Sequence, residues 1–332
     1  MSTTTPTTSP GPEPTATGRA ERPRVFAITS GKGGVGKTML AANLAAALAR
    51  RGERVLVIDA DLGLANLDVV LNLQPRHTLH DVFTGRGTLE QALLTAPGDF
   101  QVLLAGSGLI EYSRLTPTVR EQFARLIDTV RPHYDRVLID TGAGISDVVL
   151  YAISMADETL VIATPEPTAL ADAYATVKVL GLQQGRASMM LVVNQTHRHG
   201  EGRHVAAQLQ SVIDRFVTLP AGGSIRLSPL GEIVSDTAVR QAVQRRQLVT
   251  LAYPGSDAAQ GIAAIAMRLA TLHPPAGRQP MPPGMQMTLV APPTPAPAAP
   301  DVPPGEATET PSPGPDAAGA AVPGETTAGS TS

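Results

Sequence analysis

The sequence predicts an α/β fold in which a mostly parallel, twisted β-sheet is covered by helices on both faces. Short runs of Val, Leu and Ile alternate along the chain with longer stretches of helical periodicity. The short runs are apolar throughout rather than alternating, which is typical of strands buried on both faces. Acidic residues follow several of these runs directly, at the strand ends where such sheets bind their ligands.

The order of apolar runs and helical patterns gives the expected elements. The expected strands cover residues 25–29, 54–59, 100–104, 136–140, 159–163 and 189–194. The expected helices cover residues 39–51, 115–131, 145–156, 168–182, 201–215, 236–246 and 257–272. Gly52 is expected to end the first of these helices.

Composition divides the chain into one domain and two tails. A length of 332 residues suggests about two domains, but residues 1–23 and 274–332 are dominated by Pro, Thr, Ser, Ala and Gly. Such segments bury too little apolar surface to offset the entropy of ordering, so both are expected to be disordered. Residues 24–273 are expected to form a single α/β domain with a full core.

Several classes of protein are excluded by composition and charge. The chain has no cysteine, which rules out disulfides and iron–sulfur ligation. The N-terminus lacks a signal-peptide pattern and no run reaches the ~18–20 apolar residues of a membrane span, so a cytoplasmic protein is expected. The net charge is −3, of which the C-terminal tail carries −4, and a domain close to neutral has no general attraction to nucleic acid.

Residues 31–38 fit the phosphate-binding pattern G-x-x-x-x-G-K-[ST] between an expected strand and an expected helix. Glycines let backbone amides surround phosphate oxygens at the N-terminus of a helix. Lys37 is expected on the β- and γ-phosphates and the Thr38 hydroxyl on Mg²⁺. The residues expected to hold the nucleotide here are Gly31, Lys32, Gly33, Gly34, Val35, Gly36, Lys37, Thr38 and Met39.

A second lysine inside the loop makes the motif more specific. The run from Lys32 to Thr38 resembles the deviant Walker A loop of the MinD/ParA family of ATPases. The resemblance implies that the chain binds ATP and Mg²⁺ and forms a homodimer in the ATP state. It also implies a catalytic role for Lys32, which reaches across the dimer interface to the partner's ATP, alongside Lys37.

Two acidic strand ends complete the expected site. Residues 59–68 resemble the switch I segment of MinD-type ATPases, which implies that Asp61 activates the attacking water and that Asp59 supports Mg²⁺ through water. The role agrees with the chemistry, because in-line attack needs an acceptor for the water proton. Asp140 ends a Walker B-like strand and is expected on a metal-bound water. The glycine-rich segment 141–144 then forms switch II and resembles the FlhG branch of the family.

Other fragments resemble the same branch, and two features depart from it. Residues 73–82 resemble a stretch of FlhG proteins. Asn194 corresponds by resemblance to a residue that contacts adenine, and residues 230–236 resemble a loop near the adenine base. The N-terminus lacks the motif with which FlhG proteins often engage the GTPase FlhF. The helix at 257–272 has Arg268 as its only cation, so packing on the sheet is favoured over a membrane surface.

The expected function is a dimerising switch that hydrolyses ATP and controls the number or placement of flagella or of another polar assembly. The expected partners are an FlhF-like GTPase, a flagellar switch component or a transcription regulator, with peripheral contact at the inner face of the membrane or the cell pole. The alternative is a ParA-like ATPase that partitions DNA or cargo, for which Arg240, Arg245 and Arg246 are the available cations. Related iron–sulfur carriers are excluded by the absence of cysteine.

Overall fold

The computed structural model describes residues 23–61, 66–106 and 115–274. Apart from Pro23 and Pro274, the two expected tails lie outside these ranges, as do residues 62–65 of the expected switch I segment.

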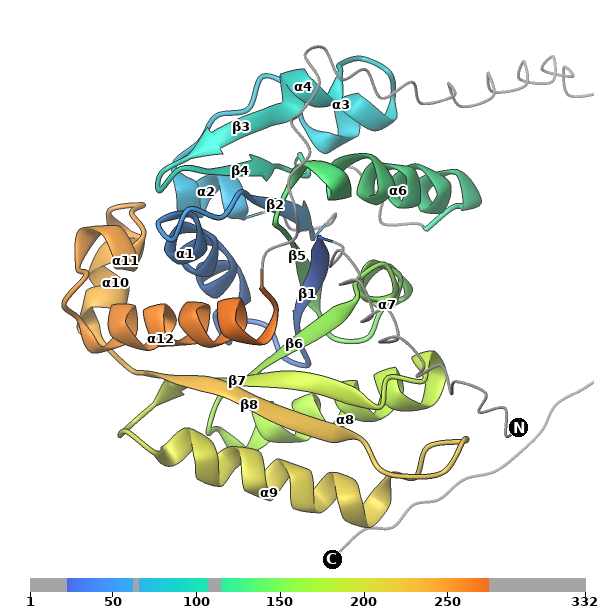
Figure 1. Cartoon of the computed structure of the whole chain (residues 1–332), viewed down its shortest axis with the longest axis vertical. Helices are drawn as coiled ribbons and strands as arrows, with labels where there is room; N and C mark the ends of the chain where they lie inside the picture. Colours follow the sequence, from blue (N-terminus) through green and yellow to red (C-terminus); the bar gives the residue numbers. More distant parts are fainter. Residues whose placement is uncertain (1–22, 62–65, 107–114, 275–332) are drawn as a thin grey trace, which may run out of the picture. The chain divides into compact units, whose positions relative to one another are not determined.

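An eight-stranded sheet with the order β3-β4-β2-β5-β1-β6-β7-β8 forms the centre of the domain (Figure 1). All neighbouring strands are parallel except β3 and β4, which pair antiparallel. This arrangement confirms the predicted mostly parallel sheet. The strands are β1 Arg24–Ser30, β2 Val55–Ala60, β3 Leu93–Ala96, β4 Phe100–Leu103, β5 Arg136–Ala143, β6 Glu158–Ala163, β7 Ser188–Thr196 and β8 Arg226–Val234.

Helices cover both faces of the sheet, as the unbroken apolar strands require. One face packs against α3 Leu79–Phe83, α4 Leu89–Ala92, α6 Pro117–Val130, α7 Asp147–Ser154, α8 Pro167–Gln184 and α9 Glu201–Phe216. The other face packs against α1 Lys37–Ala49, α2 Leu67–Leu71, α10 Thr237–Gln244, α11 Val249–Ala252 and α12 Asp257–Leu272. A short 3-10 turn, η1 Arg131–His133, leads into β5.

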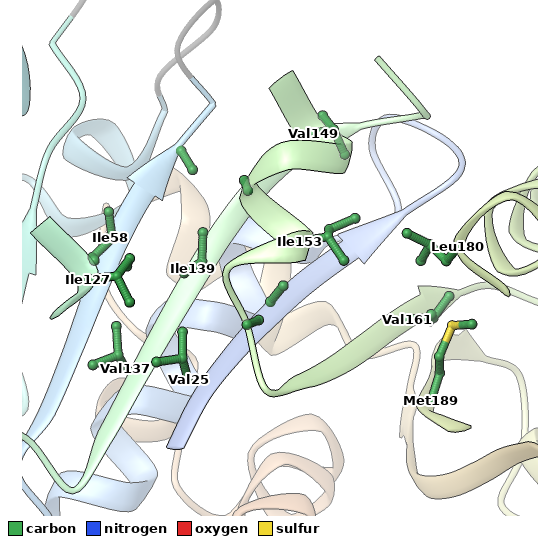
Figure 2. Close-up of a cluster of buried hydrophobic side chains, with 14 of the residues drawn as sticks. Val25, Ile58, Ile127, Val137, Ile139, Val149, Ile153, Val161, Leu180 and Met189 are labelled. Carbon is green, nitrogen blue, oxygen red and sulfur yellow. The ribbon is translucent and has the colours of Figure 1, made fainter. Parts of the chain in front are cut away.

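Alternating side chains along each strand feed these two cores. Figure 2 shows part of the first core, in which Val25 of β1 and Ile139 of β5 share one cluster with Ile127 of α6 and Ile153 of α7. The next residues along β1 and β5, Phe26 and Leu138, belong to the opposite core with α1 and α12. Both faces of the inner strands β1 and β5 are buried for this reason.

Two strands differ from the sequence prediction. The short edge strand β3 lacks a long apolar run, so no pattern marks it. Strand β8 contains Pro229, which argues against a central strand but is tolerated at the edge of the sheet, where β8 lies. Residues 230–234 are therefore strand rather than the expected loop, and Asp236 caps α10 by accepting a hydrogen bond of 2.8 Å from the Ala238 amide.

The last helix packs on the sheet, as predicted. Ile262, Ile265 and Leu269 of α12 are buried, whereas Leu272 is exposed where the helix ends. The buried guanidinium of Arg136 pairs with Glu53 at 2.7 Å and also donates to the carbonyl of His273, which fixes the end of α12 to the sheet. Among the described residues, no helix is long and apolar enough to cross a membrane.

Candidate nucleotide-binding site

The phosphate-binding loop joins β1 to α1 and has the conformation that its glycines permit. Gly34 and Gly36 have φ values of 78° and 95°, in the left-handed region that residues with a Cβ rarely adopt. Gly36 is the N-cap of α1, so the helix begins at Lys37, two residues earlier than the sequence prediction of 39. The loop therefore presents backbone amides and a helix N-terminus to one space, an arrangement suited to phosphate.

Gly31 is required for a different reason, which is close packing. A Cβ at Gly31 would lie 2.1 Å from the carbonyl oxygen of Asp172 in α8. The start of the loop is thus pressed against the backbone of α8, where no side chain fits.

A cavity of about 980 Å³ opens above the loop. This volume suits a ligand the size of a nucleotide. Of the predicted residues, Gly33, Gly34, Gly36, Lys37, Thr38, Met39 and Asp61 line it. The facing wall comes from the end of β5, the start of α7 and the region of α6, with Leu115, Arg120, Gly142, Ala143, Ser146, Asp147, Val148 and Val149. Residues 141–143 of the expected switch II are thus the last residues of strand β5. The cavity joins the phosphate loop to the ends of β2 and β5.

Lys37 is buried at the bottom of this cavity, with 9% of its surface exposed. Burial lowers the pKa of Lys37, and the charges of Asp140 and Asp61 oppose that shift. A partly desolvated ammonium beside two carboxylates is placed to meet phosphate oxygens, whose negative charge stabilises it further.

Two buried carboxylates lie at the ends of neighbouring strands, and one of them, Asp140, is beside Lys37. Asp59 of β2 and Asp140 of β5 are register partners in neighbouring parallel strands, exposed by only 1% and 2%. Burial raises the pKa of Asp140 to about 7, against the hydrogen bond from Thr38 and the charge of Lys37. Burial also raises the pKa of Asp59 well above its ordinary value, and the charge of Asp140 adds to that rise. Ionisation of both carboxyl groups is therefore unfavourable without more positive charge than Lys37 supplies.

The residues present fit a magnesium ion. Asp59 Oδ2 and Asp140 Oδ1 are buried and have no hydrogen-bond partner in the described part of the chain. Asp140 also accepts a hydrogen bond from the Thr38 hydroxyl, and carboxylate and hydroxyl oxygens are the ligands that Mg²⁺ prefers. No cluster of three or more His, Cys, Asp or Glu that could hold a metal occurs among the described residues, so the protein alone offers few ligands. Mg²⁺ in such sites takes its remaining ligands from phosphates and water.

Six predicted residues do not line the cavity, namely Gly31, Asp59 and Asp140, described above, and Val35, Asn194 and Lys32. Val35 is buried, and its carbonyl accepts a hydrogen bond of 2.8 Å from the side-chain amide of Asn194. Asn194 thus braces the phosphate loop, and its predicted contact with adenine stays a prediction. Lys32 points to its own chain, where its ammonium donates to Glu166 at 2.7 Å and to Thr168 at 2.8 Å.

The partners of the loop on α8 and one cation of the cavity wall were not predicted from the sequence. Glu166 and Thr168 lie within five residues of the end of β6, and their place after a strand end was the available signal. The hydrogen bond from Lys32 lowers the pKa of Glu166. Asp172 and Arg120 carry no sequence signal, because only the packing of α8 and α6 brings them to the loop and the cavity.

The three arginines of the DNA alternative do not share one helix. Arg240 lies in α10, whereas the helix ends at Gln244 and Arg246 has a φ of 52°. All three side chains are exposed. Arg246 donates to the side chain of Asn72 at 3.4 Å. The expected helix over residues 236–246 thus ends before Arg245 and Arg246.

Comparison with known proteins agrees with this geometry. The family model of the AAA domain matches residues 23–190. The antiactivator FleN of Pseudomonas aeruginosa is 39% identical over 246 residues, which cover 74% of this chain and 86% of FleN. The flagellum site-determining protein YlxH of Helicobacter pylori is 30% identical over 252 residues, covering 73% of this chain and 80% of YlxH. The solved structure of MinD from Pyrococcus horikoshii with Mg-ADP superposes with a TM-score of 0.60 at 28% identity, covering 75% of this chain and 96% of that one.

The phosphate loop, the two acidic strand ends and the parallel sheet define a P-loop nucleotide-binding protein. With the matches above, the chain belongs to the MinD/ParA family of P-loop ATPases. Within that family it is similar to the FlhG-type flagellar regulators FleN and YlxH.

Proposed function

We propose that this protein is an ATP-driven switch, which closes into a homodimer with ATP and opens after hydrolysis to ADP and phosphate. The observation that carries the proposal is a single cavity lined by Lys37, Thr38 and Asp61, with the buried carboxylates of Asp59 and Asp140 behind it. Cation, hydroxyl and carboxylates are the groups that phosphoryl transfer to water requires.

Each residue has a distinct role in this proposal. Lys37 neutralises the β- and γ-phosphate oxygens, while the amides of the loop hold the phosphates in line with the attacking water. Asp61 accepts the proton of that water. Thr38, Asp59 and Asp140 would hold Mg²⁺, the aspartates through water, and the ion supplies charge neutralisation on the phosphates when it is bound. Lys32 reaches the phosphates of the partner subunit.

The cellular role is proposed from the relatives. FleN carries the description antiactivator and YlxH the description flagellum site-determining protein. By similarity, this protein controls the number or placement of flagella through an FlhF-like GTPase, a flagellar switch component or a transcription regulator. It works from the cytoplasm at the inner face of the membrane or at the cell pole.

The Asp61→Ala variant tests the proposal with two readouts. We expect Mg²⁺-dependent phosphate release to fall about 100-fold or more, the usual effect of removing a general base, while nucleotide binding is kept. In Pseudomonas aeruginosa cells lacking FleN, the wild-type protein is expected to restore the flagellar number and the variant to fail. Asp128→Asn, on the exposed side of α6, is the control and should behave as wild type.

Unchanged phosphate release from Asp61→Ala would contradict the catalytic assignment. If the wild-type protein hydrolyses ATP but does not restore the flagellar number, the ATPase activity would be supported and the flagellar role would be contradicted.

A further inference from the structure

The nucleotide cavity is lined by a second cation, Arg120, on the wall that faces the phosphate loop. Arg120 lies in the first turn of α6, which packs on one face of the sheet. Lys37 is the first residue of α1, which packs on the other face (Figure 1). The cavity therefore receives one cation from each side of the sheet. The mechanism proposed above uses Lys37 and gives Arg120 no role.

Tyr151 of α7 fixes the position of Arg120. The carbon atom at the centre of the Arg120 guanidinium lies 5.7 Å from the centroid of the Tyr151 ring. The Tyr151 hydroxyl donates a hydrogen bond of 2.6 Å to the carbonyl oxygen of Arg120. The ring thus holds the side chain and the hydroxyl holds the backbone of the same residue, which ties the start of α6 to α7.

The guanidinium of Arg120 still has N–H donors to offer. Within the described part of the chain it makes no hydrogen bond and no ion pair, whereas Arg125, further along α6, pairs with Glu121. Contact with an aromatic ring leaves the guanidinium N–H groups unused. Arg120 is exposed, and such a contact contributes little at an exposed site, so an acidic ligand can replace it.

Arg120 lies toward the end of the cavity that holds Asp61. A small apolar pocket beside the cavity joins Ala60, the residue before Asp61, to Val119 and Tyr151, the two neighbours of Arg120. In the proposed mechanism Asp61 accepts the proton of the attacking water, so the terminal phosphate of ATP must lie beside it. The position of Arg120 therefore fits the terminal phosphate better than the base or the sugar.

We propose that Arg120 binds the terminal phosphate of ATP in its own subunit and thereby favours ATP over ADP. This inference rests on the ATP binding proposed above. The planar guanidinium offers two parallel donors to two phosphate oxygens, and hydrogen bonds between charged groups are stronger than neutral ones. Lys37 meets the phosphates from the loop, and Arg120 meets the last of them from the opposite wall. ADP lacks that phosphate, so Arg120 contributes nothing to its binding.

Two substitutions separate the charge of Arg120 from the shape of its donor group. Arg120→Gln removes the charge, and we expect it to weaken binding of a non-hydrolysable ATP analogue about tenfold while Mg-ADP binding is unchanged. Arg120→Lys keeps the charge but loses the two parallel donors, and we expect a loss of about threefold for the same analogue.

The test uses the full-length chain and measures binding alone. Dissociation constants for adenylyl imidodiphosphate with Mg²⁺ and for Mg-ADP are obtained by competition with a fluorescent ADP, at several protein concentrations. Arg125→Gln is the matched control, because Arg125 is also an exposed arginine of α6 but does not line the cavity. We expect this control to bind both nucleotides as the wild type does.

Weaker binding of the ATP analogue with unchanged binding of Mg-ADP would support the proposal. Equal losses for the two nucleotides would show that Arg120 maintains the cavity and does not distinguish the terminal phosphate. A loss confined to protein concentrations at which the chain dimerises would assign the contact to the nucleotide of the partner subunit. Either of these results, or the absence of any loss, overturns the inference. A wild-type protein that binds neither nucleotide would overturn the proposed function itself.

Discussion

Asp59 and Asp140 stand side by side because β2 and β5 are parallel neighbours that end at the same edge. Burial favours the protonated form of both carboxyl groups, and the charge of Asp140 further disfavours ionisation of Asp59. The lysine and threonine of the loop only partly oppose this, so the pKa of Asp140 remains near 7. A divalent cation would supply the missing positive charge, and proton release from the pair should therefore accompany metal binding.

The affinity for Mg-ATP should depend on pH around neutrality. Asp140 is mostly protonated at pH 6 and mostly ionised at pH 8, because its pKa is about 7. We expect Mg-ATP binding by calorimetry to strengthen about tenfold over that interval, beyond the dependence that ATP itself contributes. The Asp140→Asn variant measures the pH dependence that ATP itself contributes. Equal pH profiles for the wild type and this variant would contradict the role of Asp140 in metal binding.

The raised pKa of Asp140 also affects the stability of the protein without bound metal. There, a rise in pH is expected to lower the free energy of unfolding, whereas it strengthens Mg-ATP binding. The pKa of Asp140 is raised above its ordinary value of 3.8, so the folded state binds more protons than the unfolded state between that value and about 7. The free energy of unfolding therefore falls as the pH rises through this window. Metal binding at pH 8 would offset that loss.

At the scale of elements, the phosphate loop is shaped by its neighbours as much as by its own glycines. The Asn194 amide at the end of β7 donates to the carbonyl of Val35, and α8 packs against Gly31. The glycine pattern predicts that a loop exists, but it does not predict which helix presses on it. The sequence therefore does not predict the contacts of Glu166, Thr168 and Asp172 with the loop. These residues reach the loop only because of where β6 and α8 lie.

The contact between Gly31 and α8 gives a sharp prediction. In Gly31→Ala, the new methyl group would lie 2.1 Å from the Asp172 carbonyl oxygen, so the loop or the helix has to move. We expect overpacking to lower the free energy of unfolding by about 1–3 kcal/mol and to weaken nucleotide binding. Chemical denaturation and fluorescent-nucleotide titration measure the two effects.

Gly33→Ala is the matched control for the free energy of unfolding, because a Cβ at Gly33 meets nothing within 4 Å. Equal stability for the two variants would show that α8 yields easily to the loop.

At the scale of the whole molecule, the fold followed from the sequence because its main strands are buried on both faces. Continuous apolar runs predicted β1, β2, β4, β5, β6 and β7. Strands at the edges were missed because exposure removes the pattern: β3 is short, and β8 tolerates Pro229 at its open side. The same argument explains α12, whose apolar stripe predicted burial on the sheet.

The residues of the candidate site also differ in how well the sequence predicts them. Residues that act through a contiguous motif, such as Lys37 and Thr38, were predictable, and the structure brings them to one cavity with Asp61. Residues that act through contacts between distant elements were not. Arg120 of α6 reaches the cavity wall only because α6 packs against the same core as strands β2 and β5.

The most direct test of the central claim is the solution mass of the Asp61→Ala variant by light scattering, first in Mg-ATP and then in Mg-ADP. Removing the general base should trap the ATP state while leaving the loop and the metal site intact. The account predicts twice the mass of one chain in Mg-ATP and the mass of one chain in Mg-ADP. The same mass in both nucleotides would contradict a switch operated by ATP.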